Sequence, residues 1–108
     1  MRTMRIKKRF YDLIRSGKKT LEVRIGYDSI NRIQIGERIE LVTHTGSCVV
    51  RIGDIRRYHT MEAMLTVEPW GSIAPDSGSG EDVLRLLKQI YPPNKEKLGV
   101  VVFEFIRE

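Results

Sequence analysis

Residues 17–24 read Gly17-Lys18-Lys19-Thr20-Leu21-Glu22-Val23-Arg24, and a helical pattern ends here as a strand pattern begins. Before this stretch, apolar side chains recur at helical spacing, which predicts a helix over residues 6–16. Glycine accepts the left-handed conformation that commonly follows a helix, so Gly17 is predicted to form the C-terminal cap. After it, apolar and polar side chains alternate over residues 20–25, which predicts a strand. On that strand Glu22 and Arg24 share one face, about 7 Å apart.

The positive charge of the chain is concentrated around this stretch. Residues 1–24 contain nine lysines and arginines and two acids, whereas the remainder contains ten basic and twelve acidic residues. A localised basic surface favours an anionic partner, and nucleic acid is the commonest one. The alternative is a solvated basic helix without a partner, because surface charge also serves solubility.

Two further strands are predicted after a loop over residues 26–35. They span residues 38–44 and 48–58, and Thr45-Gly46 between them is typical of a hairpin turn. The inward parity of the second strand changes around Gly53-Asp54. An extra residue at this point would restore the alternation, so the sequence predicts a β-bulge there.

The second half of the chain combines helices with one last strand. Helices are predicted over residues 60–65 and 80–91, the latter stopped by two prolines. A strand is predicted over residues 98–106, and its near-continuous apolar run implies burial on both faces. Residues 67–80 are rich in Pro, Gly, Ser and Asp and are predicted to form a loop.

The fold class that these elements predict is α+β. We expect a curved, mostly antiparallel sheet of four to six strands with about three flanking helices. A bulged strand and a strand buried on both faces favour closure of the sheet into a small barrel. The length of 108 residues suits a single domain, residues 1–108, and 41% apolar with 31% charged residues is typical of a soluble globular protein.

Membrane, metal and cofactor classes find no support in the sequence. No run approaches the ~18 apolar residues of a membrane span, and residues 1–5 lack the apolar core of a secretion signal. With a single cysteine, Cys48, these features favour a cytoplasmic location. Two histidines and one cysteine without ligand spacing predict no metal site, and the absence of a glycine-rich phosphate loop predicts no cofactor.

The spacing Gly-x-Lys-x-x-Glu-x-Arg, formed here by Gly17, Lys19, Glu22 and Arg24, resembles the signature of the ASCH domain family. The preceding helix, Gly36-Glu37 before the next strand and the last strand extend the resemblance over nearly the whole chain. The resemblance implies a β-barrel of the PUA-like type. It also implies that the signature residues line a cleft suited to RNA or a nucleotide.

The resemblance carries a catalytic alternative as well. Some small bacterial members resemble amidohydrolases that act on acetylated cytidine, and others have been considered ribonucleases. For the amidohydrolases it implies a trio of lysine, threonine and an acidic residue. Lys19 matches the lysine, but Glu22 stands at the position of the threonine, so a carboxylate replaces the hydroxyl nucleophile. The acid would fall near Asp76, in the predicted 67–80 loop.

The chemistry of the signature residues permits three interpretations. As a binding set, the basic side chains Lys18, Lys19 and Arg24 would contact phosphate or a base carbonyl, and Glu22 would accept from a base amino group. As a catalytic pair, Lys19 and Glu22 would need the glutamate pKa raised, by burial or by an acid such as Asp76, and the flanking cations oppose this. As a structural set, the residues would form a salt-bridge network.

Three residues outside the signature are further candidates for ligand binding. Arg56 and Tyr58 share one face of the predicted strand, where a cation beside an aromatic ring suits phosphate contact and base stacking. Trp70, in the predicted loop, could stack on a base or cover the pocket. The alternatives are a solvated strand end for the first two and a tryptophan packed between sheet and helix.

These observations lead to three functional hypotheses. The first is an RNA- or nucleotide-binding domain whose site comprises Gly17, Lys18, Lys19, Glu22, Arg24, Arg56, Tyr58 and Trp70. The second is a hydrolase of modified nucleosides or a weak ribonuclease that uses Lys19 and Glu22. The third is a protein-interaction adaptor without a nucleic-acid ligand.

Overall fold

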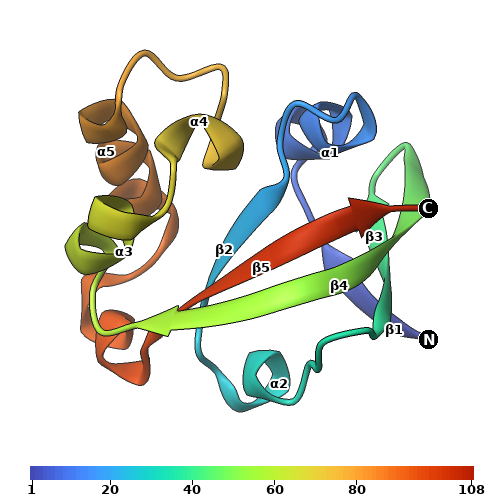
Figure 1. The fold of residues 1–108 in the computed structure, drawn as a ribbon, viewed down its shortest axis with the longest axis horizontal. Helices are drawn as coiled ribbons and strands as arrows, with labels where there is room; N and C mark the ends of the chain where they lie inside the picture. The colour runs from blue at the N-terminus through green and yellow to red at the C-terminus, as the bar shows by residue number, and fades with distance from the viewer.

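The computed structural model describes all 108 residues and has an α+β architecture (Figure 1). The strands are β1 (Arg2–Arg5), β2 (Leu21–Ile25), β3 (Arg38–Thr43), β4 (Gly46–Tyr58) and β5 (Val100–Arg107). The helices are α1 (Lys8–Arg15), α2 (Asp28–Asn31), α3 (Met61–Val67), α4 (Trp70–Ile73) and α5 (Gly80–Ile90), with a 3₁₀ helix, η1 (Pro93–Leu98). None of the helices has the length and apolar character needed to cross a membrane.

All five strands belong to one curled, mixed sheet in the order β1-β3-β4-β5-β2. The pairing of β1 with β3 is parallel, and the other three pairings are antiparallel. The predicted barrel is confirmed in part: the sheet curls into a half-barrel, but it does not close, because β1 and β2 are left as open edges that share no backbone ladder. We call the gap between them the seam. Side chains, described below, bond to the backbone carbonyls on both sides of it.

Two hydrophobic cores share β5. The first packs α1 against the β1, β3 and β4 side of the sheet, and Val101 and Phe103 of β5 belong to it. The second packs α3, α4 and α5 against β2, and Val100 and Val102 of β5 belong to it. Figure 1 shows these three helices gathered on one side of β2 and β5, away from β1 and β3. The predicted burial of the last strand on both faces is therefore confirmed.

The predicted hairpin and bulge are both present. β3 ends at Thr43 and β4 begins at Gly46, so the turn lies where it was expected. The register between β4 and β5 shifts between Ile52 and Asp54, which places the bulge at Gly53. A Cβ atom on Gly53 would lie 2.8 Å from Ile106 Cδ1, so a larger residue at the bulge would push the exposed side chain of Ile106 aside.

Four short elements were not predicted: β1, α2, α4 and η1. The last three are helical, so the chain has more helices than the three or so that were expected. β1 has four residues, of which only Met4 is buried, so it shows no alternation over a useful length. α2 and α4 are single turns inside the segments predicted as loops. Periodicity cannot identify elements of this length. α1 begins at Lys8 rather than at residue 6 because the chain before it belongs to β1 and its link.

Candidate binding site at the open edge of the sheet

The turn after α1 delivers the signature residues to the free edge of β2. Gly17 has a φ of +82°, and the amides of Gly17 and Lys18 donate to the carbonyls of Ile14 and Leu13. This is the predicted left-handed cap. β5 pairs with only one edge of β2, so the carbonyls along the other edge need partners from elsewhere.

Lys19 supplies one of these partners and is itself buried, with 3% of its surface exposed. Its ammonium donates to the carbonyl of Leu21 in β2, and to the carbonyl of Ile73 in α4 at 2.6 Å. Nζ also lies 3.2 Å from Oε1 of Glu22, so all three of its protons are engaged. Burial lowers the pKa of Lys19 from its ordinary value, against the pull of Glu22. Lys19 joins β2 to α4 and has no donor left for a ligand.

Glu22 is held as a carboxylate between two cations. The residue is 7% exposed, with Oε1 facing Lys19 and Oε2 accepting from Arg24 Nε at 2.8 Å. Burial acts to raise the pKa of Glu22, but the pull of Lys19 and Arg24 outweighs it, and the pKa lies below its ordinary value. A general base would need the opposite shift. The geometry therefore favours a preorganised polar wall over a proton acceptor.

Arg24 bridges the seam. While Nε bonds to Glu22, Nη2 donates to the carbonyl of Arg5 at the end of β1, at 2.8 Å. Nη1 donates to no group of the protein, and about a fifth of the side chain, 21%, is exposed. Among the three signature side chains, Arg24 alone retains N–H groups that a bound molecule can use.

A pocket of about 170 Å³ lies against these three residues, between the seam and the helices α4 and α5. Most of its walls are apolar, with Phe10, Leu86 and Ile90 among them. The phenol of Tyr91, another wall residue, donates to the carbonyl of Val23, the second free carbonyl of the β2 edge. The pocket is thus a small, mostly apolar slot with a few charged groups at its edge, a form typical of small-molecule sites.

Two basic residues on the link between β1 and α1 also line the pocket. Arg5 and Lys7 are exposed, and neither forms an ion pair with any carboxylate of the protein. Most other cations near the first helix are paired, for example Lys8 with Asp12 at 2.9 Å. Uncompensated positive charge therefore lies beside the apolar slot, where it can attract an anionic ligand.

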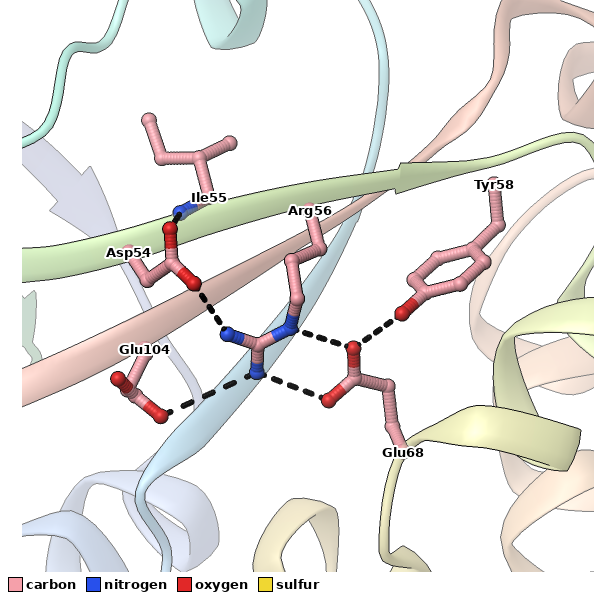
Figure 2. A network of polar contacts seen from close by, with 6 residues as sticks. All are labelled: Asp54, Ile55, Arg56, Tyr58, Glu68 and Glu104. Carbon is pink, nitrogen blue, oxygen red and sulfur yellow. Dashed lines mark hydrogen bonds and ion pairs between the residues drawn. The ribbon is translucent and has the colours of Figure 1, made fainter.

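Arg56 and Tyr58 lie in a separate network and do not line the pocket (Figure 2). Arg56 forms a bidentate ion pair with Glu68, at 2.6 and 2.9 Å, and bonds to Asp54 at 2.7 Å. Tyr58 donates its hydroxyl to the same buried Glu68. These hydrogen bonds, those from Arg56 above all, hold the pKa of Glu68 below its ordinary value. The network links Glu68, at the end of α3, to β4. The polar groups of Arg56 and Tyr58, which the sequence analysis expected to contact RNA, are bonded to Glu68 instead.

The remaining predicted residues also lie outside the pocket lining. Trp70 starts α4, and its indole packs against Gly80 at the start of α5 and against the second core. Trp70 does not line the pocket, so it takes the packing role that the sequence analysis gave as the alternative. Lys18 is exposed beside Gly17. Asp76 pairs with Arg9 at 2.6 Å, and this bond lowers the pKa of Asp76. Arg9 thus holds the carboxylate of Asp76, which remains close enough to Lys19 for the two charges to attract each other.

Sequence reasoning missed several residues that form the pocket. Phe10 falls within the helix predicted over residues 6–16, but its ring lies 5.4 Å from the Lys19 ammonium and forms part of the pocket wall. Tyr91 falls at the end of the helix predicted over residues 80–91. Arg5 and Lys7 contributed only to the count of basic residues. No local sequence pattern marks these four residues as neighbours, because the pocket brings together residues that are far apart in the chain.

The family model of the ASCH domain matches residues 4–107. The chain therefore belongs to the ASCH domain family, whose members are generally RNA-binding-like. This confirms the resemblance seen in the motif at residues 17–24.

Solved structures of small proteins share the whole fold. The crystal structure of the hypothetical protein PH0355 has a TM-score of 0.89 and 28% identity, covering 98% of this chain and 97% of that one. The solution structure of protein PF0455 from Pyrococcus furiosus has a TM-score of 0.80 and 29% identity, covering 98% and 96%. No match was found among curated proteins.

Proposed function

We propose that the chain binds single-stranded RNA or a nucleotide by taking one base into the pocket at the seam. The observation that carries this proposal is the pocket itself, a mostly apolar slot with the ion pair of Glu22 and Arg24 in its wall. Membership of the ASCH domain family and the relation to PUA-like RNA-binding barrels that it implies support the same assignment.

The wall suits the edge of a base. Arg24 offers the unused protons of Nη1 to a carbonyl or ring nitrogen, and Glu22 retains lone pairs that can accept from an amino or imino group. The apolar side chains replace water against the two faces of the ring. Lys19 takes part only indirectly, because its protons hold Leu21, Ile73 and Glu22 in place.

Binding is tested with a fluorescently labelled single-stranded RNA of mixed sequence, titrated at several salt concentrations. Phosphate contacts release counterions, so affinity should fall with salt at a slope of about −0.7 per contacted phosphate on logarithmic axes. Arg24→Gln should weaken binding about tenfold or more, and so should Ile90→Trp, which fills the slot without changing charge. Arg57→Gln is the matched control, because Arg57 is exposed, unpaired and outside the pocket.

No detectable affinity for RNA or nucleotides would overturn this proposal. So would an affinity that is insensitive to salt and to both pocket variants. The adaptor hypothesis would remain if neither binding nor turnover were found.

One observation favours the hydrolase as a second candidate. Burial lowers the pKa of Lys19, which is the direction that makes a lysine a better nucleophile or base. Against it stand the three acceptors that hold the ammonium and the lowered pKa of Glu22. Turnover of acylated nucleosides or short RNAs that both Lys19→Met and Glu22→Gln abolish, with the fold intact, would establish it. No turnover across that panel would remove it.

A further inference from the structure

A second hollow, of about 450 Å³, adjoins the pocket at the start of α1. We call it the rim hollow, and its lining consists of Arg5, Ile6, Lys7, Lys8, Thr43 and His44. The first three of these residues also line the pocket. The link between β1 and α1 is therefore a shared wall, and one ligand can occupy both spaces.

Thr43 is the unusual member of this lining. It follows Ile39 and Leu41 on the inward face of β3, where those two side chains are fully buried, and it is itself only 6% exposed. Its hydroxyl forms no hydrogen bond within the protein. No fully buried side-chain oxygen or nitrogen lacks a partner, so this hydroxyl keeps some exposure, and Thr43 lines the rim hollow. A threonine at an inward position with an unused hydroxyl can donate to water or to a molecule bound in that hollow.

The charges around the rim hollow indicate that the bound molecule is negatively charged. Arg5 and Lys7 have no carboxylate partner, and no acidic residue lines the hollow. α1 starts here with no acid in its first turn and no side-chain cap, and Lys7 and Lys8 add positive charge to the positive end of the helix. This arrangement is electrostatically unfavourable for an empty hollow and favourable once an oxyanion is bound.

We propose that the rim hollow binds the phosphate of a nucleotide whose base occupies the neighbouring pocket. This inference rests on the proposed function and adds to it a preference for phosphorylated ligands over nucleosides. Thr43 donates its hydroxyl to a phosphate oxygen, and Lys7 and Arg5 neutralise the charge from the rim. Lys8 is a weaker contributor, because Asp12 already engages its ammonium.

The test compares each common ribonucleoside with its 5′- and 3′-monophosphates, by calorimetry at matched ionic strength. It uses the wild-type chain, Thr43→Val, Lys7→Gln and the control Lys95→Gln, an exposed and unpaired lysine on η1. We expect one monophosphate to bind about tenfold tighter than its nucleoside, the effect of one charge-assisted hydrogen bond. Thr43→Val and Lys7→Gln should each remove most of this preference. Thr43 does not line the base pocket, so Thr43→Val should change nucleoside affinity less than about twofold. Lys95→Gln should leave both unchanged.

Thermal unfolding supplies a second readout for Thr43→Val. Valine has the shape of threonine without the hydroxyl, so removing an unpartnered buried group should leave Tm equal or raise it. A lowered Tm would indicate a structural hydrogen bond and contradict the assignment.

The outcomes separate the two proposals. If nucleosides and monophosphates bind equally, or if both variants keep the full preference, the phosphate site is overturned and the base pocket stands. If neither class of ligand binds, the proposed function fails and the phosphate site fails with it.

Discussion

The side chain of Arg24 donates a hydrogen bond of 2.8 Å to the main-chain carbonyl of Arg5, so one residue of β2 closes the gap to β1 that no backbone pairing spans. The same guanidinium is anchored on Glu22, which in turn holds Lys19. The side-chain bridge across the seam and the charged part of the pocket wall thus depend on the same three side chains.

Arg24→Lys should loosen the seam. A lysine keeps the charge but lacks the planar fork that contacts Glu22 and Arg5 together, so we expect a loss of about 1–3 kcal/mol in unfolding free energy. Hydrogen exchange should rise selectively in β1, whose only strand partner is β3. Arg57→Lys is the control, since Arg57 forms no ion pair. Unchanged exchange in β1 would show that the bridge to Arg5 does not hold the edge.

Lys19→Met should be among the most damaging substitutions in the chain. It leaves Glu22 with one cation and removes the donor from the carbonyls of Leu21 and Ile73. We expect the unfolding free energy, measured with urea, to fall by about 3–5 kcal/mol, because removing one member of a buried ion pair leaves the other charge uncompensated. The exposed neighbour Lys18, changed to Met, should alter stability by less than about 0.5 kcal/mol. A small loss for Lys19→Met would mean that the carbonyls find other donors.

Stability should fall in acid through Glu22. Its pKa in the folded protein lies below the ordinary value, so its contribution is complete above that value and is lost as the pH falls through the folded pKa. Urea midpoints measured between about pH 7 and pH 3 should therefore decline more steeply for the wild-type chain than for Glu22→Gln. Glu81→Gln, at an exposed and unpaired site, should follow the wild-type curve. Parallel curves for wild type and Glu22→Gln would refute the assignment.

Glu68→Gln should separate stability from binding. The substitution weakens the bonds from Arg56 and Tyr58, and we expect a loss of about 1–3 kcal/mol in unfolding free energy. RNA affinity should remain within about twofold, because none of these residues lines the pocket. If affinity instead falls strongly while the fold is retained, the face of β4 that carries Arg56 and Tyr58 would be part of the binding surface, as the sequence analysis expected.

Local features of the site were predictable from the sequence. The cap at Gly17, the strand that follows it and the bulge at Gly53 each depend on neighbouring residues, so spacing alone locates them. The pairing of Glu22 with Arg24 follows from their shared strand face. Such features are set by φ preferences and by the two-residue repeat of a strand.

The environment of Lys19 was not predictable by the same means. Its acceptors include main-chain carbonyls of Leu21 and Ile73, and a carbonyl carries no signature in the sequence. Thr43 did carry a signal, as a polar residue in phase with Ile39 and Leu41. Only the parallel pairing of β1 with β3, between segments far apart in the chain, shows that this residue lies near Lys7.

The position of β5 between the two cores has a consequence for synthesis of the protein. Both hydrophobic layers need residues 100–107, which follow every helix in the chain. During translation the helices can form, but neither hydrophobic core can be completed until β5 has left the exit tunnel of the ribosome. The chain is therefore expected to acquire its tertiary structure in one late step, and a stop codon ahead of residue 100 should yield a product that proteases degrade.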